Sequence, residues 1–299
     1  MSGLQIENRI WDTVETLPRE RLRVLQTERL RSCVRQASQI PFYREALSRL
    51  GVDADTISGP EDVRRLPITT KEDLRQYYPL DLLAVPREKL VRIHGSSGTT
   101  GKPTFVAYTA EDLNLWTELC ARFLVAGGLR PKHTVHIAFG YGLFTGGFGL
   151  HQGVERVGAA IVPAAAGNTV RQILLLKDLD ADVLICTPSY ALNIAEVARA
   201  EGITPADWSL KYGHFGGEPW TEDMRLRIEQ EMGILAFNNY GLSEIIGPGV
   251  SGECAARRGM HLAEDHFIVE CLNPDTLEPV AEGEQGELVI TTLTKQAMP

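Results

Sequence analysis

Three features are scarce or missing in this sequence of 299 residues, and each excludes a class of protein. No apolar run reaches the ~20 residues that a membrane-spanning helix needs, and the polar, acidic start is unlike a secretory signal. Basic charge is not in excess, because 30 Lys and Arg stand against 39 Asp and Glu, which argues against a nucleic-acid partner. The five cysteines are widely spaced and odd in number, so a disulfide scaffold is not expected. The sequence therefore predicts a cytoplasmic globular protein with neither a nucleic-acid nor a membrane partner.

The chain changes character twice along its length. Residues 1–90 have mostly helical periodicity, residues 91–250 alternate short apolar strands with helices, and residues 251–299 are β-rich. Such alternation predicts an α/β fold with mainly parallel sheets flanked by helices. Ligands in these folds bind beyond the carboxyl ends of the strands, so residues just after the strands are the first candidates for a site.

The elements can be placed from apolar runs and helical spacing. The expected strands are 91–94, 104–108, 134–139, 159–163, 183–187, 211–215, 234–240, 266–271 and 287–293, and the expected helices of the middle zone are 110–126, 169–179, 189–200 and 221–232. In the first zone, Thr69 and Glu72 have the spacing of a capping box that would begin a helix at 71–77.

A loop rich in glycine and hydroxyl side chains, HGSSGTTGKPT at residues 94–104, is the most informative segment. Glycines allow positive φ and close approach of the backbone to a ligand, and successive N–H groups can form a nest for an anion. Hydroxyls and one ammonium add further donors, a composition that suits a triphosphate or pyrophosphate. The alternative is a plain turn joining two strands of a hairpin.

This loop does not have the Walker A pattern. Five residues rather than four separate Gly95 from Gly101, and Pro103 stands where Ser or Thr is required after Lys102. The loop is also followed by an expected strand, whereas a Walker loop begins a helix.

The loop resembles instead the phosphate loop of the adenylate-forming (acyl-CoA synthetase, or ANL) superfamily. Three further segments, FGYGLFTGG at 139–147, GGEPW at 216–220 and YGLSEIIGPG at 240–249, resemble motifs of the phenylacetate–CoA ligase family in order and spacing. The resemblance runs from about Trp11 to the last residue. It implies a large N-terminal domain of such a ligase, which uses ATP, Mg²⁺ and coenzyme A in the breakdown of aromatic acids such as phenylacetate. A carboxylate would attack the α-phosphorus of ATP to give acyl-AMP, and the thiol of CoA would then displace AMP.

Residue roles follow from the same resemblance. The β- and γ-phosphates of ATP would be bound by Ser96, Ser97, Gly98, Thr99, Thr100, Gly101 and Lys102. The remaining nucleotide contacts would come from an adenine segment, Gly216, Gly217, Glu218 and Pro219, and from Tyr240, Gly241 and Ser243. Glu244 would bind Mg²⁺, and it forms the predicted catalytic set together with Lys102 and Thr99.

The acyl pocket would be lined by Tyr141, Phe144, Gly217, Ile245 and Pro248, since aromatic rings beside glycine leave a flat slot for an arene. A place in the core is an alternative for Phe144. The family usually has Ala at position 217, so glycine there predicts tolerance of a slightly larger acid.

A zinc site is a weaker expectation. Cys254 and His261 have a C-x₆-H spacing, and some family members hold structural Zn²⁺ with such a pair plus two later cysteines. Those later positions do not exist in this sequence, so only half of a tetrahedral site is expected.

The end of the sequence bears on activity. Family members continue beyond the position of Pro299 with a ribose-binding motif, a hinge and a small domain carrying the lysine that promotes adenylation. The resemblance therefore predicts that these 299 residues alone turn over weakly or not at all, and relatives suggest a homodimer. The acid stays open among phenylacetate and the indoleacetate, hydroxyphenylacetate and aminobenzoate types. A non-catalytic nucleotide-binding module derived from a ligase is the rival reading.

Overall fold

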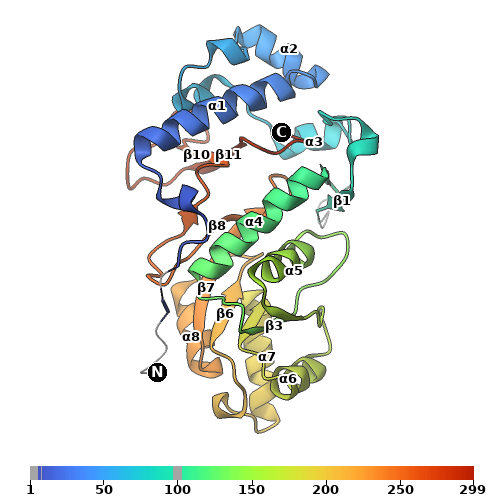
Figure 1. Cartoon of the computed structure of the whole chain (residues 1–299), viewed down its shortest axis with the longest axis vertical. Coiled ribbons are helices and arrows are strands. Elements are labelled where there is room, and N and C mark those ends of the chain that lie inside the picture. Colours follow the sequence, from blue (N-terminus) through green and yellow to red (C-terminus); the bar gives the residue numbers. More distant parts are fainter. Residues whose placement is uncertain (1–5, 8, 97–102) are drawn as a thin grey trace. The chain divides into compact units, whose positions relative to one another are not determined.

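A computed structural model describes residues 6–7, 9–96 and 103–299 (Figure 1). The chain divides into two compact units, each built from separate stretches of sequence. The sheet unit contains residues 1–12, 94–97 and 114–262, and the helical unit contains residues 13–93, 98–113 and 263–299. The sequence predicts a different division, into the zones 1–90, 91–250 and 251–299. That division stays a prediction.

A seven-stranded sheet forms the centre of the sheet unit, in the order β4-β3-β5-β6-β7-β8-β9. The strands are β3 (Thr134–Ile137), β4 (Ala160–Val162), β5 (Val183–Cys186), β6 (Tyr212–Phe215), β7 (Leu235–Leu242), β8 (Gly247–Gly252) and β9 (His261–Leu262). Strands β3 to β7 are parallel, whereas β8 and β9 run antiparallel to their neighbours. The predicted α/β class with a mainly parallel sheet is confirmed.

Helices flank this sheet, as is required where both faces of parallel strands are buried. The helices are α4 (Ala110–Ala126), α5 (Gly146–Val157), α6 (Thr169–Asp178), α7 (Pro188–Ala200) and α8 (Glu222–Met232), and a short 3₁₀ turn, η5, spans Pro205–Asp207 (Figure 1). Apolar side chains of α6, α7 and α8 pack with Leu184 and Cys186 of β5 in one buried cluster. Gly127, at the end of α4, lies against His214 and Phe237 of the same sheet.

Two parts of the sheet unit differ from the expectation. Strand β7 extends to Leu242, beyond the expected end at Tyr240, so Gly241 and Leu242 lie within the strand rather than after it. Strand β8 was not expected, because its sequence GPGVSG consists mostly of residues that are rare in strands. It pairs with β7 with a register shift between Tyr240 and Gly241.

Helix α5 was also not expected, since four glycines lower its intrinsic helix propensity. The fold explains two of them. A Cβ at Gly149 would overlap the Trp116 indole, and a Cβ at Gly153 would overlap Cys120. Trp116 and Cys120 are one turn apart on α4, so the glycines let α4 and α5 approach closely.

The helical unit combines an early stretch of the sequence, from Thr13 on, with its last residues. Its elements are α1 (Arg19–Ala37), α2 (Pro41–Leu50), α3 (Lys71–Gln76), β2 (Phe105–Tyr108), β10 (Phe267–Leu272), β11 (Glu287–Thr292) and the 3₁₀ turns η1 (Thr13–Thr16), η2 (Ala54–Thr56), η3 (Pro60–Arg65) and η4 (Arg87–Lys89). Strand β1 (Arg92–Gly95) forms a two-stranded sheet with β2, and β10 pairs with β11 as an antiparallel hairpin. Leu293, just after β11, is buried against Leu30 and Val34 of α1.

The helix predicted at 71–77 begins at Lys71 as expected, but its N-cap is Thr70 rather than Thr69. Thr70 is the N-cap of α3, where its N–H donates to the carboxylate of Asp73 at 2.8 Å. The hydroxyl of Thr69 is instead hydrogen-bonded to Tyr43 at 2.8 Å. Tertiary contact therefore selects one of two adjacent capping patterns.

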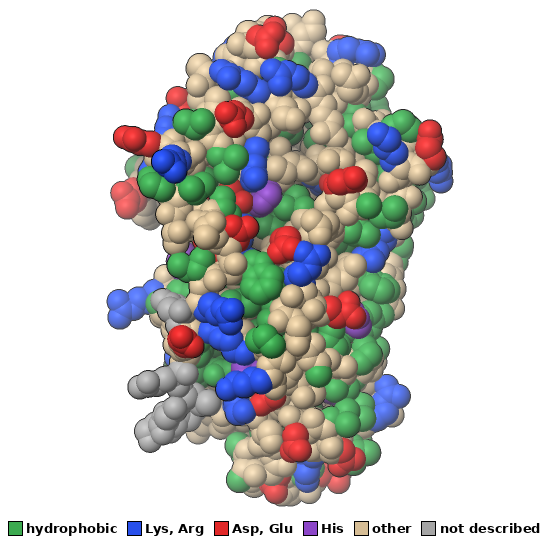
Figure 2. All heavy atoms as spheres, in the orientation of Figure 1, with side chains coloured by type: hydrophobic (Ala, Val, Ile, Leu, Met, Phe, Trp, Pro, Cys, Tyr) green, Lys and Arg blue, Asp and Glu red, His purple; other side chains and the backbone are tan. Residues whose placement is uncertain are grey.

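The surface carries charges of both signs. On the face drawn in Figure 2, acidic and basic side chains are interspersed. Among the residues that the structure describes, no helix is long and apolar enough to cross a bilayer.

A buried ion pair joins α8 to the sheet. The guanidinium of Arg225 donates to both carboxylate oxygens of Glu253, at 2.7 and 2.9 Å, and to the carbonyl of Ala236 at 2.6 Å. The same carboxylate accepts the N–H of Asn238 at 2.7 Å. Because the side chains of Arg225 and Glu253 are only 10% and 5% exposed, loss of one partner would leave an uncompensated charge.

Replacing Glu253 by Ala is therefore expected to lower the free energy of unfolding by about 3–5 kcal/mol. The matched control is Glu222→Ala, which removes an ion pair to the same guanidinium from a side chain that is 69% exposed. The control should lose no more than ~1 kcal/mol. Urea denaturation measures both changes, and equal losses would contradict the importance of burial.

Candidate functional site

Most of the described residues predicted to form a site lie at one edge of the sheet unit. In parallel strands all carboxyl ends meet at the same edge. Phe139 follows β3, Thr187 follows β5, Gly216 follows β6, and Tyr240 is near the end of β7. The structure thus brings together the segments 139–147, 216–220 and 240–249.

A buried asparagine that the sequence argument missed connects two of these segments. The side-chain amide of Asn239 donates to the carbonyl of Phe215 at 2.8 Å. A Cβ at Gly216 would lie 2.6 Å from the carbonyl oxygen of Asn239 and 2.7 Å from its side-chain oxygen. Only glycine fits at position 216, and the predicted adenine segment is therefore held directly beside Tyr240.

Gly217 has a conformational reason to be glycine. Its φ of +83° lies in the left-handed region, which costs other residues free energy. Space is not the constraint, because a Cβ would be 3.6 Å from Phe139 and 3.8 Å from Thr187, both ordinary contact distances. The expectation that glycine enlarges the acyl pocket stays a prediction.

Glu218 contacts the first turn of α7. Its carboxylate accepts the N–H of Ser189 at 2.7 Å, and Thr187 caps the same helix by accepting from Tyr190 at 3.3 Å. A negative charge is stabilised at a helix N-terminus. Glu218 thereby fixes the segment that ends with the exposed Pro219.

Tyr240 and Glu244 interact electrostatically. Burial, and secondly the charge of Glu244, raise the pKa of Tyr240 above its usual value. Both residues are half-buried. Between them Ser243 is buried, and its hydroxyl is hydrogen-bonded to the hydroxyl of Thr145 at 3.0 Å. Ser243 thus joins the β7–β8 turn to the start of α5. A Cβ at Gly241 would overlap the carbonyl of Gly247, the first residue of β8.

The acyl-side loop is defined here as residues 140–145, between β3 and α5. The hydroxyl of Tyr141 is hydrogen-bonded to Nδ1 of His151 at 3.1 Å. Burial, with a smaller contribution from the charge of Glu155, raises the pKa of Tyr141 to about 12. Phe144 is 42% exposed, which disfavours the alternative that it is a core residue.

Two predicted acyl-pocket residues lie in or beside the β7–β8 hairpin. Ile245 and Pro248 are half-buried, and the Pro248 carbonyl accepts the indole N–H of Trp116 at 2.7 Å. Trp116, which is fully buried, was not singled out from the sequence. An isolated tryptophan in an amphipathic helix gives no signal that its N–H is used at a distant turn.

Most of the predicted phosphate loop lies outside the part of the chain that the structure describes. Ser97, Gly98, Thr99, Thr100, Gly101 and Lys102 lie outside the described residues. Ser96, the residue after β1, is described and half-buried.

The zinc expectation gains no support. Among the described residues, no group of three or more His, Cys, Asp or Glu side chains could hold a metal ion. The Sγ of Cys254 accepts the N–H of Ala256 at 3.4 Å, and His261 is exposed on β9.

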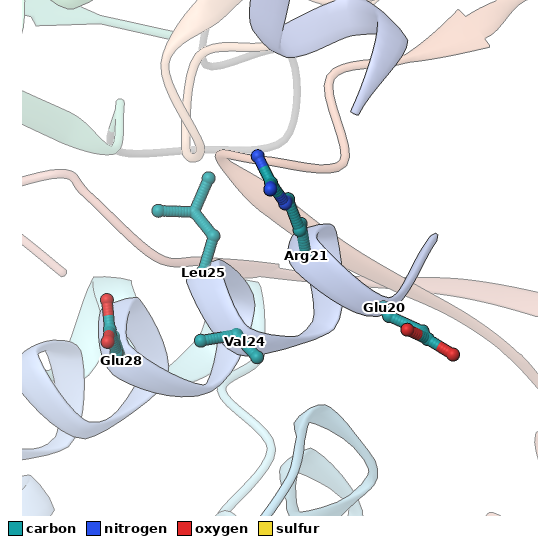
Figure 3. Close-up of a pocket in the computed structure, with 5 residues that line it drawn as sticks. All are labelled: Glu20, Arg21, Val24, Leu25 and Glu28. Carbon is teal, nitrogen blue, oxygen red and sulfur yellow. The ribbon is translucent and has the colours of Figure 1, made fainter. Parts of the chain in front are cut away.

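A hollow of about 460 Å³ lies on the helical unit, lined by Glu20, Arg21, Val24, Leu25 and Glu28 (Figure 3). All five belong to α1, and none is a predicted site residue. It offers no convergent set of polar groups of the kind that fixes a ligand.

Comparison with known proteins decides the family. Residues 23–294 match the model of a family described as AMP-binding enzyme. Over 297 residues, 98% of this chain, the sequence is 48% identical to a phenylacetate–coenzyme A ligase of Escherichia coli K12, of which it covers 68%. The chain belongs to the phenylacetate–CoA ligase family of AMP-binding enzymes.

Other relatives agree with this assignment. A phenylacetate–coenzyme A ligase of Thermus thermophilus is 53% identical over 96% of this chain and 65% of its own length, so the chain spans about two thirds of these curated relatives. A solved 2-hydroxyisobutyryl-CoA ligase in complex with 2-HIB-AMP and CoA superimposes on all of this chain and 72% of its own, with a TM-score of 0.91 and 27% identity. A solved anthranilate CoA ligase, at 18% identity and a TM-score of 0.57 over 70% of this chain and 40% of its own, shares the fold.

Replacing Gly217 by Ala is expected to destabilise the protein by about 1–2 kcal/mol, because alanine is disfavoured at positive φ. Gly140→Ala is the control, since position 140 has nothing within 4 Å of a new Cβ and is not among the glycines of positive φ. Urea denaturation of both variants tests this. A Gly217 variant as stable as the parent would show that the segment can adopt negative φ.

Proposed function

We propose that this chain provides the acid- and nucleotide-binding part of a ligase that activates an aromatic carboxylic acid, phenylacetate or a similar one, first to acyl-AMP and then to its CoA thioester. The main support for this proposal is that three family motif segments meet at the carboxyl edge of the sheet unit. There Asn239 and the Thr145–Ser243 hydrogen bond connect them. The names of the curated relatives supply the reaction type and the acid.

The reaction proceeds by two displacements. A carboxylate oxygen attacks the α-phosphorus of ATP, and the bond to pyrophosphate breaks. The sulfur of CoA, after losing its proton, then attacks the acyl carbon and expels AMP. Both the acid and ATP are anions, so the protein must neutralise charge and position the reactants.

The described residues suit nucleotide binding beside Tyr240. The backbone at Gly216 and Gly217 has no side chain that would keep a flat base away, and Glu218 fixes this segment against α7. The half-buried ring of Tyr240 offers an aromatic surface to the nucleotide. Lys102 and Thr99 are proposed to act on the phosphates from the loop that lies outside the described residues.

Mg²⁺ fits Glu244 on chemical grounds. Mg²⁺ prefers oxygen ligands and commonly takes one or two carboxylates together with substrate phosphates. Since no cluster of three potential ligands occurs among the described residues, a cage made wholly of these side chains is not indicated. When bound, the ion would neutralise charge on the phosphates, and Glu244 would be the residue that holds it.

The acid is proposed to bind between the acyl-side loop and the β7–β8 hairpin, near Tyr141, Phe144, Ile245 and Pro248. The fold does not by itself select an aromatic acid, because a structure 27% identical is a 2-hydroxyisobutyryl-CoA ligase. Indoleacetate, hydroxyphenylacetate and aminobenzoate remain alternatives, which a binding series of acyl-adenylate mimics would rank. The homodimer, the cytoplasmic location and weak turnover by these residues alone stay predictions.

The first test is calorimetric titration with a non-hydrolysable phenylacetyl-adenylate mimic, since binding does not require turnover. Tyr240→Ala should weaken binding about tenfold or more, because stacking of a base on an aromatic ring contributes ~1–3 kcal/mol. Tyr240→Phe keeps the ring and should retain most of the affinity. Absence of binding by the folded parent chain would contradict the proposed function. Binding without acid-dependent pyrophosphate exchange by the chain extended to the full length of its relatives would favour the non-catalytic module.

A second test concerns the metal. In the parent chain Mg²⁺ should strengthen the binding of ATP, and Glu244→Gln should reduce that gain by at least about tenfold, since even outer partners of metal ligands have effects of this size. Glu222→Gln, an exposed carboxylate on α8, is the control and should leave the gain unchanged. An equal Mg²⁺ effect in all three proteins would exclude Glu244 as the ligand.

A further inference from the structure

His94 is the last residue but one of β1 and the first of the segment 94–104, two residues before the predicted phosphate contacts, and is only 2% exposed. Its Nδ1 lies 2.9 Å from the carbonyl oxygen of Leu143. A carbonyl can only accept, so Nδ1 carries the proton. The N–H of Gly95 donates to the same oxygen at 2.9 Å. Two consecutive residues of one strand therefore hold a single carbonyl group.

That carbonyl belongs to the acyl-side loop. The Leu143 and Phe144 side chains are 51% and 42% exposed, so their own packing contributes little to fixing the centre of the loop. At this centre the backbone is held by the two hydrogen bonds to the Leu143 oxygen, whereas Tyr141 and Thr145 hold the loop nearer its two ends.

The imidazole is itself held by aromatic neighbours. It meets the Trp116 indole edge-on, with ring centroids 5.6 Å apart, and lies 5.9 Å from the ring of Phe148. Trp116 donates to the Pro248 carbonyl at 2.7 Å, and a Cβ at Gly247 would lie 2.5 Å from the indole. The contacts that orient His94 thus extend to the β8 segment proposed to line the other side of the acyl pocket.

We propose that His94 is a positioning residue that fixes the acyl-side loop, so that recognition of the acyl group depends on its Nδ1–H. The inference rests on the proposed function, to which it adds a residue not assigned to the site. His94 orients the backbone at Leu143 without itself contacting the substrate. Affinity for the acyl part of the ligand should therefore depend on His94, and affinity for the nucleotide part should not.

Two variants separate hydrogen bonding from packing. His94→Phe keeps a ring against Trp116 but has no N–H, whereas His94→Asn places an amide N–H near the position of Nδ1 but has no ring. The probes are the non-hydrolysable phenylacetyl-adenylate mimic and AMP, titrated calorimetrically. His261→Phe, at an exposed histidine of β9, is the matched control, and near-ultraviolet circular dichroism establishes that each variant is folded.

His94→Phe is expected to bind the mimic about 3- to 10-fold more weakly than the parent, the usual effect of one hydrogen bond, with AMP affinity within about twofold. His94→Asn should recover most of the loss, and His261→Phe should behave as the parent. The inference is overturned if His94→Phe binds the mimic normally, if AMP and mimic weaken equally, or if His94→Asn binds no better than His94→Phe. A parent chain that binds AMP but not the mimic would overturn the proposed acyl site, and this inference with it. If His94→Phe does not fold, His94→Asn decides the question. An affinity for the mimic close to that of the parent supports the hydrogen-bonding role, whereas a loss of about tenfold indicates that the ring acts by packing.

Discussion

The geometry of the sheet unit depends on the contacts that the buried indole of Trp116 makes. Its N–H bonds to Pro248, its edge meets His94, and glycines at 149 and 247 occur where a Cβ would overlap it. Segments from α4, α5, β1 and β8 are therefore positioned by one rigid side chain. A protein interior packed at crystal-like density transmits any displacement of such a group to its neighbours.

Polar contacts complete this arrangement at the carboxyl edge of the sheet. Asn239 connects β6 to β7, Thr145 connects α5 to Ser243, and Glu218 connects α7 to the segment proposed to bind adenine. Each is a single hydrogen bond of modest net energy, but a buried polar group is costly to leave without a partner. The proposed site thus gains its shape from side chains that need not touch a ligand.

Much of this could be predicted from the sequence alone. The parallel strands β3 to β7 and the helices α4, α6, α7 and α8 follow from apolar runs and helical spacing, because burial on both faces demands such patterns. Helix α5 and strand β8 could not be predicted in this way. Their glycines oppose helix and strand propensity, and only the proximity of Trp116, Cys120 and Leu119 accounts for them.

The fold class, the family resemblance and the segments that meet in the proposed site can all be recognised from the sequence, because chemistry-bearing motifs keep their order and spacing. The residues that hold those segments in place depend on tertiary contacts. His94, Trp116, Thr145 and Asn239 carry no local pattern that reveals a partner, since each acts on a residue between 24 and 132 positions away. Contacts at such separations arise only when the sheet and its helices bring distant parts of the chain together.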